Sequence, residues 1–105
     1  MFGDLLGNME EQQKAVQEKL ANAKVEGEAG SGAVRVSADG NQKILNISIN
    51  QDALDWNDKE QVEDLVLEAV NRALEVSKEK AADEAQNLVK DILPTGMGGL
   101  KDLFG

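Results

Sequence analysis

The sequence predicts a single α+β domain in the order helix, three antiparallel strands, helix. Two charged segments with helical spacing of apolar residues flank residues 25–49, where glycines separate stretches of alternating polar and apolar residues. The chain has 105 residues, the length of one domain, and only three aromatic side chains. A chain this small with so few large apolar residues makes a thin core. We therefore expect the protein to form homo-oligomers.

The composition excludes several kinds of site. The chain has no cysteine and no histidine, which removes thiolate chemistry, disulfides, the commonest general base and the usual zinc ligand. We predict no catalytic residue, no metal, no cofactor and no small-molecule substrate. The first residues lack the charged and apolar regions of a signal peptide, and no apolar run approaches the ~18 residues of a membrane span. These features predict a soluble cytoplasmic protein without a membrane partner.

The first helix is predicted to begin at Asn8 and to end near Lys24. Asn8 and Glu11 have the spacing of a capping box, in which each side chain binds a backbone N–H at the helix start. The apolar residues form a stripe with a seven-residue repeat. They are Met9, Val16 and Ala23, with Leu20 beside them. This stripe is narrow, and resembles the seam of a coiled coil more than a broad core face.

Two short strands are predicted next. The first covers residues 25–28, and Gly30, Ser31 and Gly32 form the turn after it. In the second strand Val34 and Val36 face one side, with Arg35 and Ser37 on the other. Asp39-Gly40 predicts a type I′ turn, which needs a positive φ angle at both central residues.

The third strand is predicted in the segment KILNISIN, residues 43–50. Leu45, Ile47 and Ile49 alternate with a second set of side chains on the opposite face. That second set is Ile44, Asn46 and Ser48. Three strands alone are only marginally stable. The apolar face of this strand therefore needs cover from the two helices or from the sheet of a partner.

The second helix is predicted to run from about residue 58 to residue 93. Asp58 with Gln61, or Asn57 with Glu60, provides its cap. Its apolar face consists of residues spaced three and four apart: Val62, Leu65, Val66, Ala69, Val70, Ala73 and Val76. A helix of this length suggests a coiled coil or a break, and the polar residues 77–86 suggest a projecting stalk. Pro94 ends the helix, so that residues 1–93 form the domain and residues 94–105 a flexible, glycine-rich tail.

Several stretches together carry a family likeness. VEGEAGSGAVRVSADG at residues 25–40 and DKEQVEDLVLEAVNRAL at residues 58–74 are the most specific, supported by the initial MFG and by KEK at residues 78–80. On these residues the chain resembles the YbaB/EbfC family of bacterial nucleoid-associated proteins, and the resemblance covers residues 1–80. It implies an α/β protomer that forms a homodimer through its sheets, with helices that project like the arms of tweezers.

The resemblance also implies a function. It implies binding of double-stranded DNA with little sequence preference, a change in DNA conformation, a location at the nucleoid, and no catalysis. The predicted DNA-binding residues lie on the two helices and are Lys14, Lys19, Arg72, Lys78 and Lys80.

The charge of the chain leaves a second interpretation open. The net charge is −9, which opposes phosphate binding unless cations gather locally. The lysines also have helical spacing to glutamates, in the pairs Glu10–Lys14, Glu75–Lys78 and Lys80–Glu84, and such pairs serve helix solubility. The alternative function is an acidic, dimeric protein-interaction adaptor that does not bind DNA.

Overall fold

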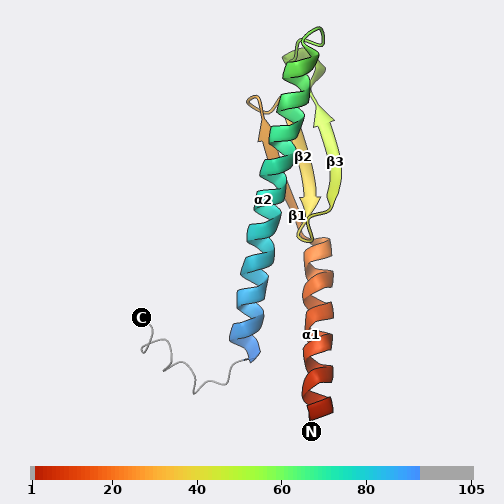
Figure 1. The fold of residues 1–105 in the computed structure, drawn as a ribbon, viewed down its shortest axis with the longest axis vertical. Coiled ribbons are helices and arrows are strands. Elements are labelled where there is room, and N and C mark those ends of the chain that lie inside the picture. Colours follow the sequence, from red (N-terminus) through yellow and green to blue (C-terminus); the bar gives the residue numbers. More distant parts are fainter. Residues whose placement is uncertain (1, 93–105) are drawn as a thin grey trace, which may run out of the picture.

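The computed structural model describes residues 2–92, with the side chains of residue 7 and residues 9–90. It confirms the predicted order and the antiparallel sheet (Figure 1). The elements are α1 (Phe2–Asn22), β1 (Lys24–Ala29), β2 (Val34–Asp39), β3 (Ile44–Ile49), the short 3₁₀ helix η1 (Gln51–Ala53) and α2 (Lys59–Ile92). The predicted flexible tail, residues 94–105, lies outside the described residues.

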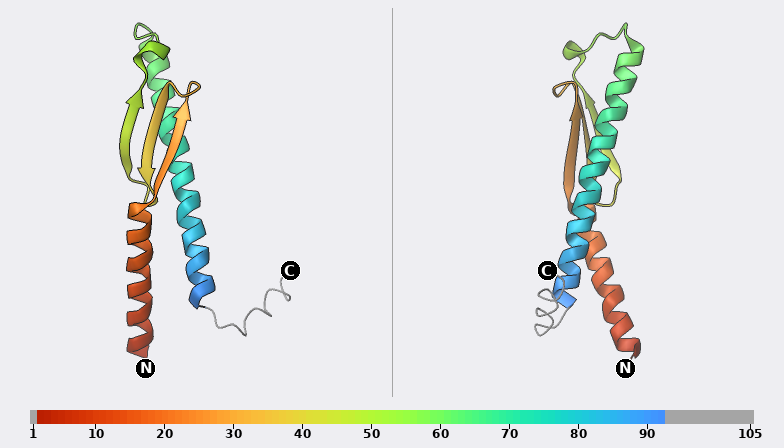
Figure 2. Two further views of the ribbon diagram at one scale, coloured as in Figure 1. Left: turned by 180° about the vertical axis from the view of Figure 1, so that it is seen from behind. Right: turned by 60° about the vertical axis from the view of Figure 1, so that its left-hand side comes forward.

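The three strands lie in the order β1-β2-β3, and α2 covers one face of this sheet (Figure 2). The core between them consists of small side chains, with Val34 and Val36 as its largest fully buried apolar members. Ala69 and Ala73 bring the backbone of α2 close to the sheet. Gly27 makes this approach possible, because a Cβ atom there would lie 2.3 Å from the backbone nitrogen of Ala73.

Helix α1 begins earlier than predicted. It starts at Phe2, and Asn8 lies inside it, so the predicted capping box at Asn8 and Glu11 is wrong. No proline interrupts the preceding residues, and each residue added to an existing helix gains a backbone hydrogen bond. That gain outweighs the preference of asparagine for a cap.

The loop between β2 and β3 also differs from the prediction. Asp39 and Lys43 pair across a three-residue loop, and the positive φ angle is at Gln42, so the predicted type I′ turn is wrong. The Asp39 carboxylate explains the longer loop, because it accepts hydrogen bonds from the backbone N–H groups of Asn41 and Lys43. The loop binds the end of α1, since the N–H of Gly40 donates to the Leu20 carbonyl at 2.7 Å.

A β-bulge changes the predicted faces of β3. Val36 pairs with Ile47, but Ala38 pairs with Ile44, so that one residue of β3 is extra between these pairs. Beyond a bulge the alternation of side chains is reversed. Ile44 therefore packs against the core, together with Ile49, whereas Leu45 is exposed. The prediction that Ile44 and Ile49 lie on opposite faces of the strand is wrong.

Helix α2 is continuous over 34 residues. The predicted cap at Asp58 is confirmed, because its carboxylate accepts a hydrogen bond from the N–H of Gln61. Val76, predicted on the apolar face, is exposed, and Ser77 is fully buried in its place. The Ser77 hydroxyl donates to the Asp39 carbonyl at 2.6 Å and accepts from the N–H of Gln42 at 2.9 Å. Two backbone groups of the hairpin loop thus need a hydroxyl at this point of the helix.

Both helices extend beyond the same end of the sheet (Figures 1 and 2). We call residues 2–19 of α1 and residues 78–92 of α2 the two arms, and the rest of the described chain the body. The protomer measures 64 × 32 × 16 Å, with a radius of gyration of 19.6 Å. A compact chain of this length has a radius of gyration of about 13 Å. The fold is therefore too extended to bury its apolar residues in one core.

Candidate functional site

The two arms contact each other where they leave the body. Lys19 of α1 forms an ion pair with Glu84 of α2, with 3.1 Å between the lysine nitrogen and the carboxylate oxygen. A shallow groove of about 270 Å³ lies between the helices here. Its lining residues are Gln12, Ala15, Val16, Lys19, Glu84, Asn87 and Leu88. Charged and apolar side chains thus share the contact between the arms.

Glu84 is the charged residue at the centre of this contact. Its side chain is only 6% exposed, and its second carboxylate oxygen lies 3.4 Å from the nitrogen of Lys80. The ammonium groups of Lys19 and Lys80 lower the pKa of Glu84, although burial acts in the opposite direction. Glu84 is therefore ionised at neutral pH, and its contribution to stability is lost as the pH falls through this lowered pKa.

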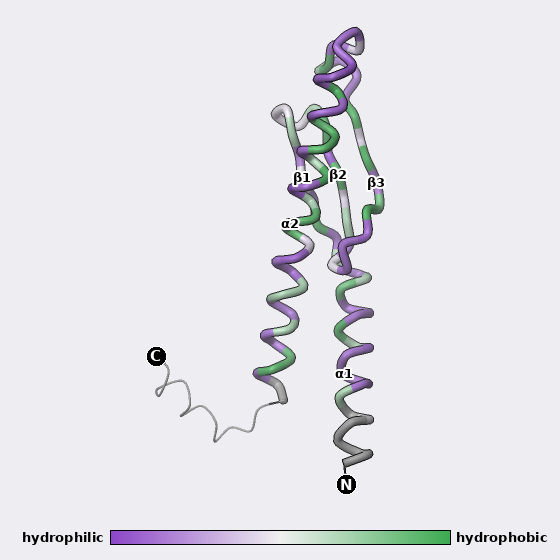
Figure 3. Tube along the Cα trace, viewed as in Figure 1, coloured by the Kyte–Doolittle hydropathy of each residue, from purple (hydrophilic) through white to green (hydrophobic). Residues whose placement is uncertain are grey.

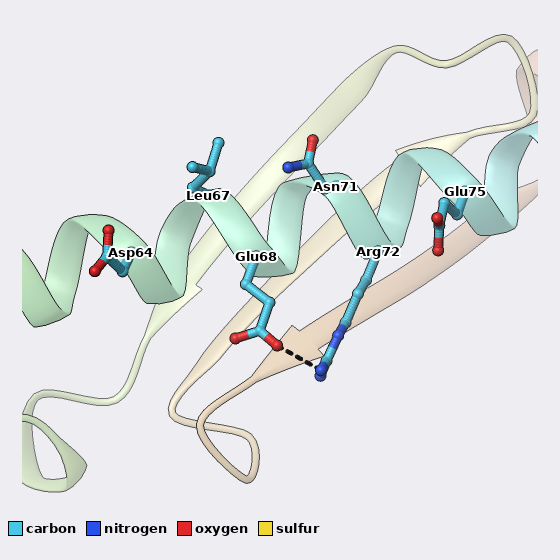
Figure 4. Close-up of a pocket in the computed structure, with 6 residues that line it drawn as sticks. All are labelled: Asp64, Leu67, Glu68, Asn71, Arg72 and Glu75. Carbon is cyan, nitrogen blue, oxygen red and sulfur yellow. Dashed lines mark hydrogen bonds and ion pairs between the residues drawn. The ribbon is translucent and has the colours of Figure 1, made fainter.

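Arg72 lies apart from the arms, beside the sheet. Its guanidinium donates to the backbone carbonyl of Glu28 in β1 at 2.7 Å and pairs with Glu68 one turn earlier in α2. Figure 4 shows this pair on a shallow depression of about 470 Å³. Its lining residues all come from α2 and are Asp64, Leu67, Glu68, Asn71, Arg72 and Glu75. Arg72 thus ties α2 to the edge strand of the sheet.

Lys14 and Lys78 are the predicted site residues without an ion pair among the described side chains. Both are exposed, one on each arm. Neither forms an ion pair within the part of the chain that the structure describes, and the expected pairs with Glu10 and Glu75 are not formed. Of the three expected helical pairs only Lys80–Glu84 is present. The structure therefore joins Lys19 and Lys80 through one carboxylate and leaves Lys14 and Lys78 without a described ion pair.

Two further lysines lie where the arms join the body. Lys24 begins β1 and pairs in register with Asp39, and Lys43 follows the hairpin loop that is bonded to Ser77. Both are exposed, and within residues 7–90 neither forms an ion pair. Neither lysine is among the DNA-binding residues predicted from the sequence. The signal that could have indicated them is their position at two strand ends that meet the same loop in an antiparallel sheet.

The negative charge is concentrated at the opposite end of the molecule. Residues 52–68 carry seven acidic side chains and one lysine, a net charge of −6 of the chain's −9. They form η1, the following loop and the start of α2, at the end of the sheet away from the arms (Figure 1). We call this region the acidic end. By contrast, the two arms together carry eight acidic and five basic side chains, a net charge of −3. The negative charge is thus densest at the acidic end.

Comparison with known proteins places the chain in a family. The model of the YbaB/EbfC DNA-binding family matches residues 2–92. The chain belongs to this family. It is 45% identical over 76 residues to a nucleoid-associated protein of Thermoanaerobacter pseudethanolicus, covering 72% of this chain and 68% of the relative. It is 38% identical over 96 residues to a nucleoid-associated protein of Chloroflexus aurantiacus, covering 91% of this chain and 88% of the relative.

A crystal structure supports the fold of this YbaB/EbfC protein. The uncharacterized protein HP0035 from Helicobacter pylori superposes with a TM-score of 0.75 at 24% identity, covering 84% of this chain and 92% of the other. In residues 2–92 no helix is long and apolar enough to cross a membrane. The same residues contain no group of three or more acidic side chains that could hold a metal ion.

Proposed function

We propose that this YbaB/EbfC protein binds double-stranded DNA as a homodimer, through its arms and with little sequence preference, and alters the conformation of the DNA at the bacterial nucleoid. We propose no catalytic role. The observation that carries the proposal is the uneven distribution of the negative charge. Six of the nine net negative charges belong to the acidic end, so the arms approach a polyanion without that charge beside them. The net charge of the whole chain therefore overstates the repulsion between the arms and DNA.

The proposed contacts are phosphate contacts from the arms and from their junction with the body. Lys14 and Lys78 make these phosphate contacts on the arms, and Lys24 and Lys43 make them at the junction. All four lysines are exposed and form no ion pair within the described residues. Phosphate contacts position a protein on DNA without reading its sequence. Arg72 remains a predicted DNA-binding residue, although its guanidinium pairs with Glu68 and donates to the Glu28 carbonyl in the body.

Fluorescence anisotropy with a labelled duplex of about 30 base pairs tests the proposal, in a salt series from about 20 to about 200 mM. We expect saturable binding that weakens steeply as salt increases, because each phosphate contact releases counterions. Two unrelated duplex sequences should bind with affinities within a few-fold of each other. An absence of binding at the lowest salt contradicts the proposal and favours the alternative, a protein partner for an acidic adaptor.

We propose the homodimer because the outer edge of β3 and its apolar side chains are uncovered. This strand is at the edge of the sheet farthest from α2 and carries hydrophobic positions (Figure 3). Leu45 and Ile47 are 49% and 45% exposed, and a strand edge offers unpaired backbone groups to another chain. The extended protomer also lacks a core large enough to cover them. A second copy of β3 supplies both the apolar cover and the backbone partners.

Replacing Ile47 with aspartate is expected to shift the protein from dimer to monomer, because the charge would have to be buried without a partner. The molar mass by light scattering after size-exclusion chromatography measures this shift. Val89 provides a matched control, since it is an exposed apolar residue on the second arm, and Val89→Asp should leave the mass unchanged. A wild-type protein with the mass of one chain, or an unchanged mass for Ile47→Asp, contradicts the proposed dimer.

A further inference from the structure

The ion pairs of Glu84 occupy two of the five lysines and arginines that the sequence predicts to bind DNA. Lys19 on α1 and Lys80 on α2 approach different oxygens of this one carboxylate, at 3.1 and 3.4 Å. The lysine side chains are 64% and 40% exposed, whereas that of Glu84 is 6% exposed. The carboxylate thus lies between the arms, and the two ammonium groups lie at the surface.

The stability of the arm contact does not require a carboxylate at this position. Ala15, Val16 and Leu88 line the same groove, so an apolar side chain at residue 84 would pack among them. Replacing a buried ion pair with apolar residues is often neutral or stabilising, and a switch role is among the best-supported uses of such pairs. The charge of Glu84 therefore calls for an explanation other than stability.

We propose that Glu84 competes with DNA phosphate for Lys19 and Lys80, and that their transfer to phosphate separates the two arms. This inference rests on the proposed DNA binding. A carboxylate and a phosphate are both anionic acceptors for lysine ammonium groups. When phosphate takes the lysines, Glu84 is left buried, charged and close to a second anion, which is costly. Movement of α1 away from α2 returns Glu84 to water and removes this cost.

The competition is tested by Glu84→Gln, which keeps the size of the side chain and removes its charge. Glu79→Gln is the matched control, because Glu79 is an exposed residue of the same arm and the change in net charge is equal. At about 100 mM salt, Glu84→Gln should bind the duplex about tenfold more tightly than Glu79→Gln. The slopes of log affinity against log salt should be equal for the two variants, because both make the same phosphate contacts once the lysines have moved to DNA.

The movement of the arms is tested by distances between spin labels on cysteines placed at Gln13 and Gln86, which are exposed on α1 and α2. The chain has no native cysteine, and refolding with excess unlabelled chain isolates the distance within one protomer. We expect saturating duplex to lengthen this distance in the otherwise wild-type protein. Glu84→Gln should broaden the distribution towards longer distances without DNA, and Glu79→Gln should not.

The outcomes separate the inference from the proposed function. If no variant binds the duplex, the proposed function fails and the competition with phosphate fails with it. If the protein binds DNA but Glu84→Gln and Glu79→Gln bind the duplex with equal affinity, only the inference is overturned. An unchanged label distance at saturating duplex also overturns it, because the lysines would then bind without arm separation.

Discussion

Exchanging Lys78 for glutamate is expected to weaken DNA binding at least about tenfold, whereas the same exchange at Lys59 leaves the affinity within about twofold. Both lysines lie on α2, and both exchanges change the net charge by the same amount. Lys78 begins the second arm, next to the buried Ser77, and Lys59 begins the helix within the acidic end. The comparison therefore tests where DNA binds and holds the total charge constant.

Adding Lys14→Glu to Lys78→Glu places a charge reversal on each arm. In a dimer this removes four proposed phosphate contacts, and we expect a loss of affinity of at least about 100-fold with a salt slope smaller by roughly three to four. Anisotropy of a labelled duplex measures both quantities, and circular dichroism confirms that the variants remain helical. If Lys59→Glu weakens binding as much as Lys78→Glu, binding follows net charge and the arm contacts are wrong.

Replacing Gly27 with alanine is expected to destabilise the fold by about 3 kcal/mol or more. An added Cβ would lie 2.3 Å from the Ala73 nitrogen, 2.7 Å from the Ala69 oxygen and 2.9 Å from the Ala73 Cα. All three are backbone atoms of α2, so no side-chain rotation relieves the contact, and the helix has to move away from β1. That movement opens the core formed by small residues on both elements.

Thermal unfolding followed by circular dichroism measures this effect, at one protomer concentration because the unfolding of a dimer depends on concentration. We expect the Tm to fall by roughly 10–20 °C. Gly7→Ala is the matched control, because Gly7 is a helical residue with nothing within 4 Å of an added Cβ. Alanine there should raise stability by about 0.5–1 kcal/mol. Equal stability of the wild type and Gly27→Ala would show that α2 does not pack this closely.

The sequence predicted the parts of the site that depend on near neighbours. Lys80 and Glu84 have i,i+4 spacing, and their pair is present. The spacing did not indicate that Lys19 approaches the same carboxylate from α1. The pairs Glu10–Lys14 and Glu75–Lys78, which were equally plausible from their spacing, are not formed among the described side chains. Helical spacing shows which side chains are able to meet, but the surrounding elements decide which of them do.

The same distinction applies to the polar residues of α2. The segment 77–86 predicted a solvent-exposed stalk, because its composition offers no apolar face. In the structure Ser77 and Glu84 are buried, one against the hairpin loop and the other against Lys19. A buried polar residue has no apolar periodicity, so its partners identify it only after the chain has folded.

The sequence by itself determined the element order, the cap at Asp58, the turn that begins at Gly30 and the family. Each structural feature in this group follows from interactions between residues a few positions apart, which leave a local pattern in the chain. Only the tertiary structure decided the pairing of β3 after its bulge, the burial of Ser77 and Glu84, and the separation of the acidic end from the arms. These features join residues distant in sequence, as when Ser77 binds Gln42 across 35 positions, and packing geometry fixes such contacts.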